Sequence, residues 1–127
     1  MLVSIYIKNL AIIKETNIMF EKGLNILTGE TGSGKSLLVK AIKLLAGEKF
    51  SKDLIRHKTN RLVVEGVFNY FQEIIEIRRV YSIKGTSKSY INDQPVSNKS
   101  LIEYTRKLID MLSLIHISEP TRPERIG

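Results

Sequence analysis

Residues 29–36 read Gly29-Glu30-Thr31-Gly32-Ser33-Gly34-Lys35-Ser36 and match the phosphate-binding pattern G-x-x-x-x-G-K-[ST] at every fixed position. The short apolar run before them, residues 24–28, predicts a buried strand. After the motif, apolar residues recur with helical spacing on one face, and Gly47 stands where a helix C-cap is expected. Strand, glycine loop and helix are the context that a P-loop requires. The alternative is a Gly/Ser-rich strand-to-helix turn with an exposed lysine.

The residue types of the motif are those expected to bind a nucleoside triphosphate. Gly29, Gly32 and Gly34 leave no Cβ to block a phosphate, so main-chain N–H groups of about residues 32–36 can point at its oxygens. We expect Lys35 to contact the β- and γ-phosphates and the Ser36 hydroxyl to bind Mg²⁺. The expected cofactors are therefore ATP and Mg²⁺. No motif nominates a catalytic base.

Composition limits the protein to one modest domain or part of one. The chain has 127 residues, 43% of them apolar and 26% charged, and it contains no cysteine for a disulfide or thiolate zinc site. Its net charge of +7 favours a polyanionic partner, nucleic acid first, although a lysine-rich soluble protein explains the charge equally simply. The first twenty residues predict neither a signal peptide nor a membrane span, so we expect a cytoplasmic protein.

Hydrophobic periodicity predicts an α/β fold with an antiparallel meander. Strands are expected at residues 2–9, 11–20, 62–70 and 74–83, which makes the strand before the P-loop the third. Asn92-Asp93 predicts a two-residue hairpin turn between residues 89–91 and 94–96. Ser97 or Asn98 is expected to cap a helix that runs through about Met111.

Two stretches are rich in cations. Residues 47–60 predict a basic surface loop, either near a nucleotide or DNA or simply solvated. Residues 78–90 carry four cations and two tyrosines without an acidic residue. They are read as exposed charges on the meander in preference to a nucleic-acid surface. The tail, residues 112–127, contains two prolines and little apolar material, which predicts disorder.

Several stretches outside the motif resemble the RecN family of bacterial DNA repair proteins. The likeness covers about residues 1–110 and rests on these runs: Ile7-Lys8-Asn9-Leu10-Ala11-Ile12-Ile13, Phe20-Glu21-Lys22-Gly23-Leu24-Asn25-Ile26-Leu27-Thr28 with the motif itself, Asp53-Leu54-Ile55-Arg56, Val64-Glu65-Gly66-Val67-Phe68 and Ser89-Tyr90-Ile91-Asn92-Asp93-Gln94-Pro95-Val96.

This resemblance implies the N-terminal lobe of an ABC/SMC-type ATPase head, with a mixed sheet, the meander and the P-loop helix. It implies that residues 29–36 hold Mg·ATP and that Arg56 lies near nucleotide or DNA. Implied partners are DNA, bound by the full-length protein near the nucleoid, the protein's own C-terminal lobe and a second head in a head-to-head homodimer, with no membrane.

The chain departs from the family after residue 110. The glutamine loop, the ABC signature, the Walker B acids, the switch histidine and the coiled coil do not appear. We therefore expect residues 1–111 to be an incomplete domain and residues 112–127 to be a disordered or non-native tail. The chain should bind ATP without hydrolysing it alone. Two alternatives remain open: a small P-loop phosphotransferase, or a basic DNA-binding module whose P-loop is incidental.

Overall fold

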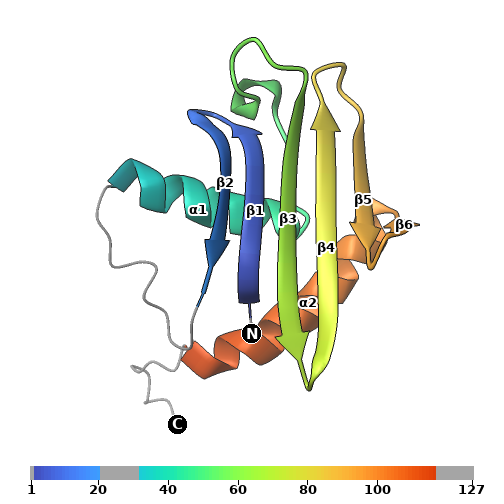
Figure 1. Ribbon diagram of the computed structural model, residues 1–127. Helices are drawn as coiled ribbons and strands as arrows, with labels where there is room; N and C mark the ends of the chain where they lie inside the picture. Colours follow the sequence, from blue (N-terminus) through green and yellow to red (C-terminus); the bar gives the residue numbers. More distant parts are fainter. Residues whose placement is uncertain (1, 21–31, 117–127) are drawn as a thin grey trace, which may run out of the picture.

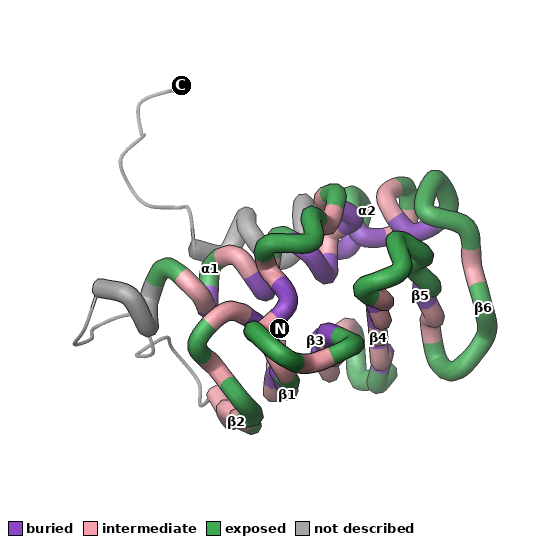
Figure 2. The backbone as a smooth tube through the Cα atoms, turned by 90° about the horizontal axis from the view of Figure 1, so that it is seen from above, coloured by how far each residue is buried: buried purple, intermediate pink, exposed green. Residues whose placement is uncertain are grey.

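The computed structural model describes residues 2–20 and 32–116, and for residues 32–35 and 109–116 it describes the main chain alone. The expected strand at residues 24–28 and the tail beyond residue 116 lie outside the described residues. Within these ranges the fold is one antiparallel sheet with two helices on one of its faces, as Figure 1 and Figure 2 show. The predicted α/β lobe, with its meander and the helix that begins in the motif, is confirmed. The strand pairings in these ranges are all antiparallel, so the mixed character expected of the sheet is not seen in them.

The sheet has six strands in the order β2-β1-β3-β4-β5-β6. Their bounds are Leu2–Leu10 for β1, Ile13–Met19 for β2, Arg61–Tyr70 for β3, Glu73–Ser82 for β4, Ser87–Ile91 for β5 and Gln94–Val96 for β6. The central pairing joins β1 to β3, with Ile7 opposite Val64, although the P-loop helix separates these strands in the chain. The sequence periodicity thus located each of these strands to within a few residues.

Two-residue turns set the register of the meander. Asn92 and Asp93 join β5 to β6 with φ of 51° and 66°, a left-handed conformation that these residue types tolerate, as predicted. Phe71 and Gln72 join β3 to β4 with φ of 50° and 66°, where a phenylalanine is an unusual choice. The side chain of Phe71 is 74% exposed.

Helix α1 spans Gly32–Leu45 and ends as the sequence predicted. The N–H of Gly47 donates to Leu44 O at 3.0 Å and the N–H of Glu48 donates to Lys43 O at 3.2 Å, the two bonds of a Schellman cap. Gly47 has φ of 102°, and a Cβ there would overlap Ile102 Cγ1. Glycine is therefore required both by the turn and by the close approach of the second helix.

Helix α2 spans Asn98–His116 and extends past the expected end near Met111. Ser97 caps it, because its Oγ accepts the Ser100 N–H at 3.1 Å and its carbonyl accepts the Leu101 N–H at 2.9 Å. No helix in the described ranges is long and apolar enough to cross a membrane. The prediction for the tail stays a prediction.

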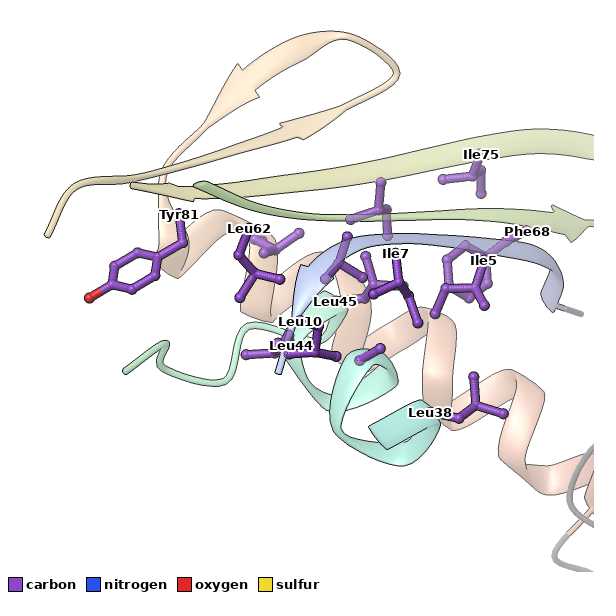
Figure 3. Close-up of a cluster of buried hydrophobic side chains, with 14 of the residues drawn as sticks. Ile5, Ile7, Leu10, Leu38, Leu44, Leu45, Leu62, Phe68, Ile75 and Tyr81 are labelled. Atoms are coloured by element: carbon purple, nitrogen blue, oxygen red, sulfur yellow. The ribbon is translucent and has the colours of Figure 1, made fainter. Parts of the chain in front are cut away.

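The core lies between the two helices and the covered face of the sheet. Figure 3 shows its side chains converging from β1, β3, β4 and α1. Gly66 on β3 makes room for α1, because a Cβ there would lie 2.6 Å from Leu45 Cδ1. The fully buried side chains include Ile5, Ile7, Leu10, Leu44, Leu62, Val64, Ile77 and Leu101.

Candidate functional site

The first turn of α1 contains the second half of the phosphate-binding motif. Gly32, Ser33, Gly34 and Lys35 are helical in their main chain, and the side chain of Ser36 is exposed. The first turn holds no acidic residue. Because N–H groups of a first helical turn have no intrahelical acceptor and carry partial positive charge, this end suits an anion.

The first half of the motif, Gly29, Glu30 and Thr31, lies outside the described residues, and so does any main-chain cradle that it forms. The roles expected for Lys35 at the phosphates and for Ser36 at the metal therefore stay predictions. The exposed Ser36 hydroxyl is compatible with its expected role as a metal ligand.

The opposite end of α1 is held by Arg79 of β4. Its Nη1 donates to Leu44 O at 2.6 Å and to Glu48 O at 2.8 Å. The side chain is 2% exposed, and this burial lowers the pKa of Arg79 to about 10, which still leaves it charged at neutral pH. The sequence analysis predicted that the cations of residues 78–90 are exposed, and this prediction is wrong for Arg79. On a strand, residues 77, 79 and 81 share one face, and here that face is covered.

Arg78, the preceding residue, points to the uncovered face. Its Nη1 lies 2.9 Å from Asp93 Oδ1, and its guanidinium carbon lies 4.5 Å from the centroid of the Tyr90 ring. The hydrogen bond that Arg78 donates to Asp93 raises the pKa of Arg78. For Arg78 the reading of a surface charge is correct.

Cations from separate parts of the chain meet at one end of the sheet. Two adjoining depressions, of about 510 and 470 Å³, share Ile83 at their boundary. Asp53 is the acidic residue among their lining residues, and it already accepts a hydrogen bond from Ser51 Oγ. We call the positively charged lining residues, together with His57, the basic edge: Lys52, Arg56, His57, Lys58, Arg61, Lys84 and Lys88.

The sequence analysis identified both cation-rich stretches of the basic edge but did not predict that they lie side by side. Residues 47–60 and residues 84–88 lie far apart in the chain, and the pairing of β3 with β4 and of β4 with β5 brings them together. The nearest signal in the sequence was the excess of positive charge in both stretches.

Arg56 is fastened to the turn between β1 and β2. Its main-chain N–H donates to Asn9 O at 2.9 Å and its Nη1 donates to Ile12 O at 3.0 Å. An isolated bridge between Leu10 and Ile55 holds the same segment. The structure therefore places Arg56 within the basic edge, with its guanidinium anchored at one nitrogen.

Carboxylates on the uncovered face of the sheet form a separate group. A hydrogen bond with Glu76, together with burial, raises the pKa of Glu65 to about 7. Glu65 alternates with Val64 and Gly66, which face the helices, so it lies on the face of the sheet away from α1. Within the described ranges, no group of histidines and carboxylates is arranged to hold a metal ion.

Comparison with known proteins adds to this geometry. A family profile described as "AAA domain" matches residues 4–119. Over 87% of its length the chain is 37% identical to the DNA repair protein RecN of Bacillus subtilis and 35% identical to RecN of a Synechocystis strain. The chain spans 22% of the length of each of these relatives.

Solved structures agree on the fold. The SMC head domain from Thermotoga maritima matches with a TM-score of 0.70 and 30% identity, over 81% of this chain and 41% of that one. A structure from a study of ATP-driven dimerization and DNA-stimulated activation of SMC ATPases matches with a TM-score of 0.71. Its identity is 20%, over 96% of this chain and 92% of that one, so it shows the fold alone.

Proposed function

The chain belongs to the AAA-domain family, and on that premise we propose that it is the ATP-binding N-terminal part of a RecN-type DNA repair ATPase. The observation that carries the proposal is the start of α1 inside the motif, with an exposed Ser36 and no acidic residue in its first turn. RecN relatives and the SMC head support a repair ATPase, and none of those reported above supports the phosphotransferase alternative.

In the proposed site the first-turn N–H groups and Lys35 bind the phosphates, and Ser36 binds Mg²⁺. The bound metal would neutralise phosphate charge. The residues of this chain cradle and orient the nucleotide, and we assign none of them a proton-transfer step. Hydrolysis belongs to a longer protein, in which the C-terminal lobe and a second head complete the site.

Calorimetric titration of the folded chain with Mg·ATP tests this function. Binding is expected for the parent, and Lys35→Ala should weaken it at least about 10-fold by removing the ammonium at the phosphates. Lys43→Ala is the matched control, because Lys43 is an exposed lysine in the last turn of the same helix. A folded parent that gives no heat with Mg·ATP, or a Lys35→Ala variant that binds like the parent, would refute the assignment.

We also propose DNA as the partner of the basic edge, with the protein acting near the nucleoid in the cytoplasm. The concentration of cations around two depressions is what supports this. Phosphate contacts release counterions, so DNA affinity should fall steeply with salt concentration.

The double variant Lys84→Glu with Lys88→Glu should weaken DNA binding and reduce the salt slope by about 2, one unit per lost phosphate contact. The double variant Arg106→Glu with Lys107→Glu makes the same change in net charge at two exposed residues of α2, outside the basic edge, and should leave the slope near its parental value. Equal losses in both variants would show that net charge, not this edge, determines binding.

A further inference from the structure

Arg79 is the only charged residue among the described side chains that is buried, and it joins four elements of the fold. Besides the two carbonyl oxygens at the end of α1, it reaches Ser89 Oγ on β5 at 3.2 Å and Asn98 Oδ1 on α2 at 3.1 Å. All four acceptors are uncharged oxygens. A single side chain from β4 therefore connects α1, β5 and α2.

Two aromatic rings restrict the orientation of this guanidinium. Its central carbon lies 4.4 Å from the centroid of the Phe50 ring. Phe50 in turn stacks on Tyr81, with ring centroids 4.6 Å apart and planes within 2° of each other. Because a guanidinium donates its hydrogen bonds in its own plane, a ring beside it helps to aim the N–H groups at the end of α1.

The other contacts of α1 with the sheet are mostly apolar. Leu38, Ala41 and Leu45 pack against the core, and apolar contacts constrain distance more than direction. Hydrogen bonds to the end of the helix are directional. The positive charge of Arg79 also complements the partial negative charge at a helix C-terminus. Arg79 is thus well placed to set the axial position and tilt of α1.

The phosphate-binding turn lies at the other end of the same rigid rod. Fourteen residues of α-helix span about 20 Å, so a tilt of about 10° at the last turn displaces the first turn by about 3 to 4 Å. We propose that Arg79 is a positioning residue for nucleotide binding, which holds the P-loop helix at its far end so that its first-turn N–H groups meet the phosphates. This inference rests on the proposed ATP-binding function.

The test compares Arg79→Lys with Ser89→Ala in the full chain. Arg79→Lys keeps the charge but loses the planar set of donors, so we expect its Kd for Mg·ATP to rise about 10-fold, because a small misplacement of binding groups weakens every contact. Ser89→Ala removes an Arg79 partner that is not on α1, and its Kd should stay within about 2-fold of the parental value. Circular dichroism sets a temperature at which all three proteins are folded.

Amide hydrogen exchange provides a second reading that does not depend on ATP. In Arg79→Lys, exchange of the amides in residues 37–45, which donate within α1, should accelerate while exchange in β1 stays at the parental rate. Uniform acceleration throughout the chain would indicate a merely structural role and overturn the inference. So would an Arg79→Lys variant that binds Mg·ATP like the parent. A parent that fails to bind ATP overturns the proposed function instead, and the exchange pattern still decides the role of Arg79.

Discussion

The two faces of the sheet use neighbouring arginines in opposite ways. Arg79 lies on the face covered by the helices, where it donates to main-chain carbonyls at the end of α1. Arg78 lies on the uncovered face, where it pairs with the exposed side chain of Asp93. The residue type is the same and the positions are adjacent. Whether a cation is structural or superficial thus depends on which face of the strand it occupies.

The largest difference between the two faces is expected where a helix packs closely on the covered face. Gly47→Ala places a Cβ against Ile102 at a position with φ of 102°, and we expect it to destabilise the chain by about 3 kcal/mol. Gly85→Ala is the matched control, because Gly85 has φ of 98° but no atom within 4 Å of its Cβ position. It should show the backbone strain alone, about 1 kcal/mol.

Urea denaturation of both variants measures this difference. Similar losses would mean that left-handed backbone strain explains both substitutions and that the approach of α2 to Gly47 adds nothing.

The two arginines themselves provide the next test. Arg79→Met leaves buried carbonyl oxygens without their donor, so we expect a loss of about 2 kcal/mol in the free energy of unfolding. Arg78→Met breaks a pair in which the Asp93 side chain is 71% exposed, and it should lose less than about 1 kcal/mol. Thermal and urea unfolding give both values, and a larger loss for Arg78→Met would contradict the distinction between the faces.

The smallest expected effect concerns the carboxylates of the uncovered face. The folded-state pKa of Glu65, about 7, lies above its ordinary value of 4.5, so Glu65 stabilises the fold fully below about pH 4.5 and this contribution is lost as pH rises through 7. The hydrogen bond with Glu76 and burial are the main causes of this raised pKa, while Arg78 lowers it and Asp93 raises it. The pKa of Tyr6 on the same face is raised mainly by its hydrogen bond with Glu15, and Glu65 adds a smaller increase.

The free energy of unfolding of the parent should therefore fall by about 1 kcal/mol between pH 5 and pH 8, after allowance for solvent screening. The variant Glu65→Gln should not show this fall. Glu103→Gln, at an exposed position on α2, should retain the parental decline. Parallel stability curves for Glu65→Gln and the parent across this range would show that Glu65 is not the group responsible.

Much of the fold was predictable because its signals are local. Alternating apolar residues located β1 and β3, Asn92-Asp93 located a hairpin, and Gly47 located the end of α1. The motif at residues 29–36 likewise predicts its own chemistry from residue type and spacing. The predicted contacts of that motif with phosphate and Mg²⁺ remain to be measured.

Less could be predicted where residues distant in the chain meet. The doublet Arg78-Arg79 interrupts an apolar run, and its sequence does not reveal that one member caps a helix whose last turn lies more than thirty residues earlier. The basic edge could not be predicted as one surface either, because its residues come from stretches that lie far apart in the sequence. Strand pairing assembles it from segments on either side of β3 and β4.

The amino-acid pattern alone determines the elements, their turns and the phosphate-binding loop, because periodicity, glycine conformation and motif spacing act over a few residues. Only the tertiary structure decides which cation is buried, what holds the far end of the P-loop helix and which charges share a surface. Those properties depend on packing between segments that the chain separates, and packing is a property of the assembled fold.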